Sequence, residues 1–145
     1  MKRLLILAII SVFVLSACKK EDALSEVPEI TLLKVGPDII KAYEDSIYFS
    51  ISYKDGDGDL GSADPLVKNL FVQDHRIDLT YEYRISELVP NGASVGIQGI
   101  LNVSIANTVL TGSGNSESVY YRIWVVDRAR HRSNTLVIGP LKVIE

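Results

Sequence analysis

From residue 29 onward the hydrophobic residues of this chain recur with a period of two, and no long stretch has the period of an amphipathic helix. In residues 47–53 the large apolar side chains occupy every second position and Ser50 and Ser52 fall between them, so one face of this strand is expected to lie in the core. Residues 79–85 alternate in the same way, with Tyr81 and Tyr83 on the apolar face. The pattern predicts strands at residues 30–35, 47–53, 69–72, 79–85, 95–105, 119–126 and 135–144.

Turn-forming residues separate these strands at modest intervals. Gly36-Pro37 ends the first strand, Gly96 and Gly99 are expected to bend the fifth, and Gly139-Pro140 is expected to break the last. About seven short strands in this arrangement predict an all-β fold, namely a two-sheet antiparallel β-sandwich formed by residues 29–145 as one domain.

The N-terminus has a different pattern. Met1, Lys2 and Arg3 form a short cationic start, followed by an uncharged apolar run at residues 4–17. A membrane-spanning helix needs about 20 apolar residues, whereas a run of this length after a basic start is typical of a secretory signal peptide. We therefore expect residues 1–17 to be a signal peptide that is removed from the mature protein.

The residues that close this run, Leu15-Ser16-Ala17-Cys18, resemble the lipobox of bacterial lipoproteins. The resemblance implies that Cys18 becomes the mature N-terminus and carries covalent lipid, palmitate included, that anchors the chain durably on a membrane. The alternative is a free or buried thiol, since Cys18 is the only cysteine and no intramolecular disulfide is possible. Residues 18–28 are polar, charged and closed by a proline, which predicts a flexible tether between lipid and domain.

The charged residues directly after this cysteine, Lys19-Lys20-Glu21-Asp22, resemble the surface-export signals of Bacteroidetes lipoproteins. This resemblance implies a location in the bacterial cell envelope, anchored in the outer membrane and exposed at the surface; an inward-facing periplasmic location is the alternative. Cleavage removes two of the 15 basic residues and leaves 13 against 18 acidic ones, a formal charge of −5. A mildly acidic chain is not expected to bind nucleic acid.

An acidic run follows the second predicted strand, with the sequence Asp55-Gly56-Asp57-Gly58-Asp59-Leu60-Gly61. The glycines allow the backbone to fold tightly and to turn three carboxylates toward one point, where a divalent cation would relieve their mutual repulsion. Calcium is the ion expected, because it accepts about six to eight oxygen ligands in a flexible geometry. The alternative is a solvated turn, since Asp and Gly are common turn formers.

The acidic run is not an EF-hand, because Leu60 and Leu66 stand where that loop needs a glycine and a bidentate glutamate. In a sandwich, however, the loops after the second and the sixth strand open at the same end of the domain. Asp127 directly follows the sixth predicted strand and is expected to join the acidic run. The expected calcium ligands are therefore Asp55, Asp57, Asp59, Asp127 and Asp64.

Residues 121–134 resemble the closing strands of bacterial immunoglobulin-like modules, in which an aspartate, small residues and a Ser-Asn pair follow an aromatic-rich strand. The acidic run resembles one that recurs in Bacteroidetes lipoproteins. Together the two motifs imply an immunoglobulin-like or cadherin-like sandwich and no known reaction. The chain lacks the paired cysteines of antibody domains, so the resemblance is to the wider class of sandwiches.

We recognise no catalytic arrangement in the sequence and do not expect an enzyme. His75 and His131 lie far apart and outside metal-ligand spacings, and no nucleophile elbow, His-Glu-x-x-His motif or phosphate-binding loop is present. Residues 128–132 form a basic loop, which either receives a carboxylate or phosphate of a partner or is a solvated loop that offsets its acidic neighbours.

The expected function is that of a membrane-anchored, non-enzymatic binding or structural module, stabilised by calcium, that presents loops to a protein or glycan. The alternative is an accessory lipoprotein that captures carbohydrate or peptide for an uptake system. Trp124 is expected to be buried, as is common for a tryptophan on an inner strand of a sandwich. Exposure of Tyr81 and Tyr83 would favour a glycan ligand, because aromatic rings stack on sugars.

Overall fold

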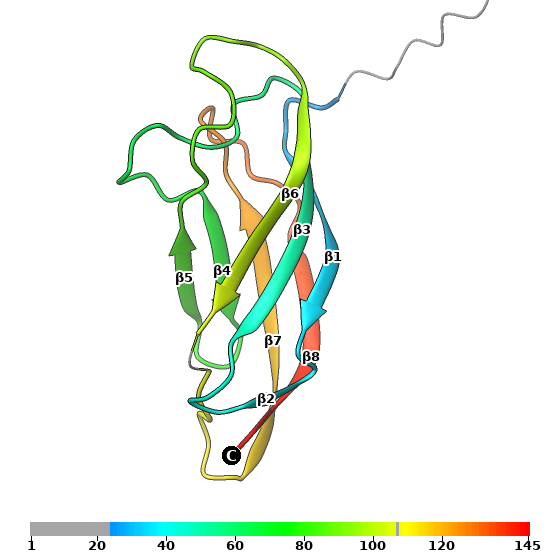
Figure 1. Cartoon of the computed structure of the whole chain (residues 1–145), viewed down its shortest axis with the longest axis vertical. Helices are drawn as coiled ribbons and strands as arrows, with labels where there is room; N and C mark the ends of the chain where they lie inside the picture. The colour runs from blue at the N-terminus through cyan, green and yellow to red at the C-terminus, as the bar shows by residue number, and fades with distance from the viewer. Residues whose placement is uncertain (1–23, 107) are drawn as a thin grey trace, which may run out of the picture.

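The computed structural model describes residues 24–106 and 108–145 (Figure 1), so the predicted signal peptide and Cys18 lie outside the described residues. Within those ranges the chain forms strands and no helix, and hence none that could cross a membrane. The strands are β1 (Glu29–Gly36), β2 (Ile39–Lys41), β3 (Ile47–Asp55), β4 (Leu70–Asp74), β5 (Leu79–Tyr83), β6 (Ile97–Ile105), β7 (Ser116–Val125) and β8 (Leu136–Ile144).

The strands form two sheets, as the alternating pattern predicted. One has the order β1-β3-β6 and the other the order β2-β8-β7-β4-β5, and every pairing is antiparallel except that of β2 with β8. The apolar faces of both sheets contribute to a single core. Phe49 of β3 and Tyr121 of β7 join the two layers through an edge-to-face contact, with ring centroids 5.5 Å apart. The all-β, sandwich-like fold is thus confirmed.

The period-two pattern identifies the core face of β3 correctly. Ile47, Phe49, Ile51 and Tyr53 are all buried, whereas Ser50 and Ser52 lie on the opposite, partly exposed face. Burial of each large apolar side chain contributes about 1.5–3 kcal/mol. In β7 the same alternation buries every second residue from Val119 to Val125.

Three details of the predicted strands are wrong. The pattern missed β2, which is three residues long and pairs with the end of β8. Gly99 does not form a bulge in β6, because the register with β3 is unbroken from Ile105 to Ile97. Gly99 is instead covered by the ring of Tyr53, whose hydroxyl would lie 2.7 Å from an added Cβ. Gly139-Pro140 does not break β8 into two strands; the pairing of β7 with β8 shifts register there, and β8 continues to Ile144.

The connections that follow β3, β5 and β7 gather at the end of the molecule where the described chain begins, and the C-terminus lies at the opposite end (Figure 1). We call this region the loop end. It comprises residues 24–28, 56–69, 84–96 and 126–135. The first of these segments belongs to the predicted tether, and its Ser25 carbonyl accepts a hydrogen bond from the Gly56 N–H at 2.7 Å.

Candidate metal site at the loop end

The acidic run begins at the end of β3 and folds tightly in the β3–β4 loop. Asp55 is the last residue of β3, and Gly58 has a left-handed backbone conformation with φ of 75°. A Cβ at Gly56 would clash with the carbonyl of Leu24, and one at Gly58 with the carbonyl of Val95. The glycines are therefore required because the N-terminal segment and the β5–β6 loop pack directly against the acidic loop.

Three carboxylates from two loops meet at this point. One oxygen each of Asp55, Asp59 and Asp127 lies within 4.8 Å of the others. Calcium binds its oxygen ligands at about 2.3–2.6 Å, so two ligands on opposite sides of one ion are about 5 Å apart. The three carboxylates therefore have the spacing that a single cation requires, and the two loops approach each other as the sandwich topology predicted.

Backbone N–H groups hold one oxygen of each carboxylate. The bonds run from Leu60 N to Asp55 Oδ2 (2.8 Å), from Ala129 N to Asp59 Oδ2 (2.9 Å) and from His131 N to Asp127 Oδ1 (2.7 Å). Among the described residues, no hydrogen-bond donor reaches the buried Oδ1 atoms of Asp55, Asp57 and Asp59. Asp55 is 0% exposed. A buried carboxylate oxygen without a donor is costly, and a cation bound between these oxygens would compensate for that cost.

Burial and repulsion by neighbouring carboxylates both favour the protonated forms of Asp55 and Asp59. Removal from water raises the pKa of Asp55 to about 6; the hydrogen bond from Leu60 opposes this shift, and the charges of Asp57 and Asp59 add to it. The pKa of Asp59 is also raised, first by burial and then by the charges of Asp127 and Asp57. A divalent cation would reverse this effect because it favours the charged form of every carboxylate around it.

Two side chains of the basic loop border the cluster. The Arg128 guanidinium donates hydrogen bonds to backbone carbonyls of the acidic loop, those of Gly61 (3.1 Å) and Gly58 (3.5 Å). The Nδ1 atom of His131 lies 3.1 Å from Asp127 Oδ2. The Arg128 bonds join the two loops, whereas the contact of His131 with Asp127 lies within the β7–β8 loop. The sequence pattern did not assign either role, although the spacing of four between Asp127 and His131 allows both to face each other in one turn.

Asp64 lies away from the cluster, contrary to the expectation that it reaches the same ion. It is exposed, and its carboxylate accepts a hydrogen bond from the N–H of Leu66 at 2.9 Å. After Gly61 the β3–β4 loop turns to pair Ser62 with Ser86 of the β5–β6 loop, which carries Asp64 outward. Asp57 was also an expected ligand, but it is not among the three carboxylates that meet, although its Oδ1 atom is buried.

Trp124 is not buried in the core, contrary to expectation, but lies half-buried on the outer face of the five-stranded sheet. Its ring stacks on Phe71 of β4 at 5.4 Å between centroids, with 12° between the planes. The guanidinium of Arg132 lies 4.3 Å from its centroid. Neighbouring side chains of the domain therefore already engage the indole, which leaves it poorly suited to stacking on a sugar.

Tyr81 and Tyr83 are half-buried, so the exposure that would favour a glycan ligand is not observed for these rings. The hydroxyl of Tyr83 donates to the Ser104 carbonyl at 2.7 Å. Tyr48 is the more exposed ring, at 62%. It borders an open hollow of about 700 Å³ on the outer face of the three-stranded sheet, lined also by Lys34 and Asn102.

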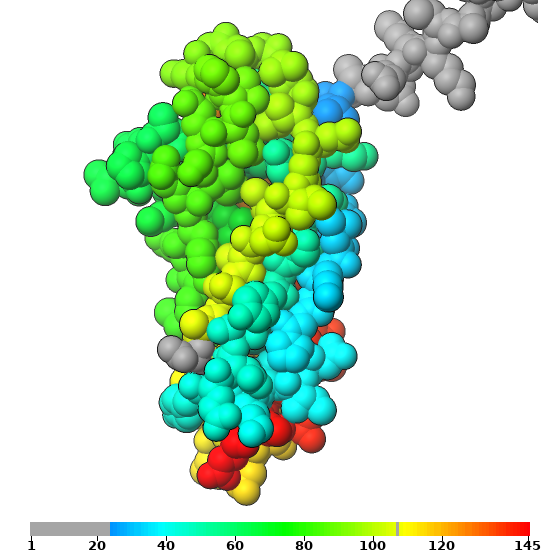
Figure 2. Space-filling view, viewed as in Figure 1, coloured from blue at the N-terminus to red at the C-terminus, as the bar shows by residue number. Residues whose placement is uncertain are grey.

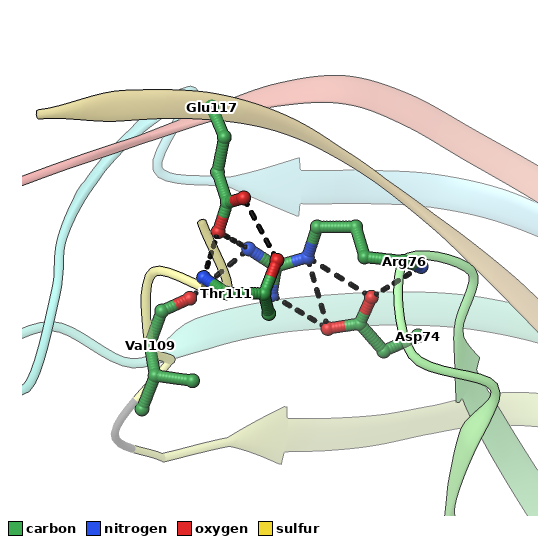
Figure 3. Close-up of polar contacts among 5 residues, drawn as sticks. All are labelled: Asp74, Arg76, Val109, Thr111 and Glu117. Atoms are coloured by element: carbon green, nitrogen blue, oxygen red, sulfur yellow. Dashed lines mark hydrogen bonds and ion pairs between the residues drawn. The ribbon is translucent and has the colours of Figure 1, made fainter. Parts of the chain in front are cut away.

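A second charged cluster ties the β4–β5 turn to β7 (Figure 3). The Arg76 guanidinium binds both carboxylate oxygens of Asp74, with a shortest distance of 2.6 Å, and also reaches Glu117 and the Val109 carbonyl. Glu117 in turn accepts hydrogen bonds from the N–H and hydroxyl of Thr111. Each charged group of this cluster already has partners, so we interpret the cluster as a structural link between elements and not as a ligand site.

Comparison with family models, with curated proteins and with solved structures gives no match. The function must therefore be inferred from the site itself.

Proposed function

We propose that this chain is a lipid-anchored, non-enzymatic binding or structural module of the bacterial cell envelope, attached to the outer membrane, in which one calcium ion clamps the loops at one end of an immunoglobulin-like sandwich. Lipid on Cys18 provides the anchor. The clamp fixes the β3–β4 and β7–β8 loops, which helps the domain to present a rigid surface to a protein or glycan partner.

The observation that carries the calcium proposal is the environment of Asp55. This residue is 0% exposed, lies in a group of three carboxylates from two loops, and has a buried oxygen that no donor within the described residues reaches. A solvated turn, the alternative interpretation of the acidic run, would leave its carboxylates in contact with water. Because calcium binds the folded arrangement and not the unfolded chain, it would stabilise the domain.

The order of the strands supports the immunoglobulin-like assignment. Sheets β1-β3-β6 and β2-β8-β7-β4-β5 correspond to strands A-B-E and A′-G-F-C-C′ of that class. The chain crosses between the sheets after β1, β2, β3, β5 and β6, and the crossings after β3, β5 and β6 are typical of Greek-key connections. In this arrangement the loops after B and F share one end, where the acidic cluster lies.

The test is thermal unfolding of the mature lipoprotein in detergent, with millimolar calcium or with chelator. Calcium at about ten times its Kd adds about 1.4 kcal/mol, which corresponds to an increase in Tm of about 3–6 °C for a domain of this size. Asp59→Asn removes one charged ligand while keeping the shape of the side chain and an oxygen that accepts from the Ala129 N–H. We expect this variant to lose most of the calcium-dependent shift.

Asp64→Asn is the matched control, because Asp64 belongs to the same loop but is exposed and lies away from the cluster. It should keep the wild-type shift. An equal calcium-dependent increase in Tm in wild type and Asp59→Asn would show that calcium binds elsewhere. No increase in the wild type would mean that the acidic run is a turn that binds no calcium.

A further inference from the structure

The loop end exposes apolar side chains that the core does not use. Leu24, Leu66, Leu88 and Val95 are 36%, 84%, 39% and 51% exposed, and we call them the apolar rim. They come from the N-terminal segment, the β3–β4 loop and the β5–β6 loop. Val95 lies directly beside the acidic loop, because its N–H donates to the Asp57 carbonyl at 3.2 Å. Apolar side chains gathered at one end of a domain mark a contact surface.

The chain also enters the domain at this end. The N-terminal segment, the β5–β6 loop and part of the β3–β4 loop gather there in the space-filling view (Figure 2). Five residues separate Leu24 from Cys18. Six chain steps of at most about 3.6 Å span about 20 Å, whatever path these residues take. Lipid on Cys18 would therefore keep the loop end within about 20 Å of the headgroups. β7 is ten residues long, so the far end of this strand lies about 30 Å from the loop end.

Bound calcium would make the charges of the loop end less repulsive toward an anionic bilayer. Lys68, Arg128 and Arg130 line a hollow of about 460 Å³ beside the cluster. Glu26, Asp64 and Glu87 belong to the same end and oppose the attraction, as do the clustered aspartates in the absence of a cation. Calcium would offset two of the clustered negative charges and so weaken their opposition to an interaction of Lys68 and Arg130 with phosphate headgroups.

We propose that the loop end lies on the bilayer, with the apolar rim inserted between headgroups and acyl chains and the strands directed away from the membrane. This orientation rests on the lipid anchor of the proposed function. It leaves both outer sheet faces, the hollow beside Tyr48 included, and the C-terminal end accessible to a partner. The calcium clamp then supports the membrane-facing loops, and the partner binds elsewhere on the domain.

A competing orientation would place the three-stranded sheet on the membrane. Leu33, Tyr48 and Ile100 on that sheet are 53%, 62% and 60% exposed. β1 carries this face away from the chain entry from Glu29 onward, and its exposed basic side chains are Lys34 and Lys54. The loop end is closer to Cys18 along the chain and has three basic side chains beside one hollow. The two orientations predict different buried positions, Val95 in one and Ile100 in the other.

Site-specific fluorescence quenching distinguishes the orientations. Because Cys18 is the only cysteine and would be acylated, one introduced cysteine can be labelled selectively. Val95→Cys, Ile100→Cys and Ser113→Cys place an apolar fluorophore at the loop end, on the sheet face and in the loop before β7. Each labelled lipoprotein is reconstituted in calcium into vesicles of phosphatidylethanolamine and phosphatidylglycerol that contain nitroxide-labelled lipid.

We expect quenching of the Val95 label to exceed that of the other two at least twofold. Equal quenching at Val95 and Ser113, or stronger quenching at Ile100, would overturn the proposed orientation. The mass of the N-terminal peptide reports separately on the anchor. Absence of lipid would contradict the anchor and with it the orientation, whereas lipid on Cys18 with an unquenched Val95 label would contradict the orientation alone.

Two matched variants test the apolar rim itself. Leu66→Ser should lower the quenching of the Val95 label, because it removes the most exposed rim side chain. Val137→Ser changes an apolar residue that is 67% exposed on β8 and should have no effect. An equal effect of both substitutions would show that the rim does not direct insertion.

Discussion

Asp55 is fully buried, yet one of its carboxylate oxygens has no donor among the described residues. Its pKa of about 6 results mainly from burial, with a further contribution from Asp57 and Asp59. Without metal the folded domain therefore binds a proton at Asp55 more tightly than the unfolded chain does. The contribution of Asp55 to the free energy of unfolding is therefore largest at low pH, and it falls as the pH rises from about 4 through about 6.

The variant Asp55→Asn should remove this pH dependence. An asparagine keeps the acceptor for the Leu60 N–H and offers an amide donor to the neighbouring carboxylates, without the charge. In chelator at pH 7.5 we expect the variant to be more stable than wild type by about 1–2 kcal/mol, since one pKa unit corresponds to about 1.4 kcal/mol. The measurement is urea unfolding in chelator at pH 5 and at pH 7.5.

At pH 5 the stability difference should shrink, because Asp55 is then largely protonated in the wild type. In calcium the order should reverse, because the variant lacks a charged ligand. If Asp55→Asn is less stable than wild type in chelator at pH 7.5, the charged carboxylate of Asp55 stabilises the fold without a cation, which would contradict this prediction.

Single residues also show where inference from sequence ends. Gly99 was expected to bend β6, but it is a glycine because the ring of Tyr53 lies over it from the neighbouring strand. Trp124 was expected in the core and instead packs between Phe71 and Arg132 on an outer face. Both outcomes depend on residues that become neighbours only after the strands pair, so no local pattern reveals them.

At the scale of elements, the predicted strands succeed where one face is buried over many residues. β3 and β7 alternate over nine and ten residues and are found close to the predicted ranges. β2 was missed because three residues are too few to show a period, and its pairing with β8 is set by the connection from β1. At the edge of its sheet, β5 has its first residue, Leu79, exposed rather than buried.

Elements far apart in the sequence are also joined by the Arg76 cluster, which gives a prediction about stability. In Arg76→Met the carboxylate of Asp74, whose side chain is 2% exposed, loses its partner. Breaking a buried ion pair from one side costs about 3–5 kcal/mol. We expect a loss of this order in the free energy of unfolding, measured with denaturant.

Arg122→Met is the control, since Arg122 lies on the outer face of the same β7 and has no ion-pair partner among the described residues. A change within about 0.5 kcal/mol is expected there. The calcium-dependent increase in Tm should persist in Arg76→Met if the variant folds, because the two clusters lie at different ends of the domain. A cost below about 1 kcal/mol would show that the cluster does not stabilise the fold.

For the molecule as a whole, topology explains how much of the site was predictable. The approach of Asp127 to the acidic run follows from the rule that the loops after the second and sixth strands of a sandwich open at one end. The distance of Asp64 from the cluster could not be inferred, because it depends on the pairing of Ser62 with Ser86 within two long loops. Packing of the tether segment on Gly56 likewise depends on tertiary contacts.

The central claim is that the cluster at the loop end binds one calcium ion. The most direct measurement is equilibrium dialysis of the mature lipoprotein against radioactive calcium, beside Asp127→Asn and Asp64→Asn. The proposed clamp predicts one ion per chain for wild type and for Asp64→Asn, and a strongly weakened site in Asp127→Asn. No binding at millimolar calcium, or equal binding by all three proteins, would contradict it.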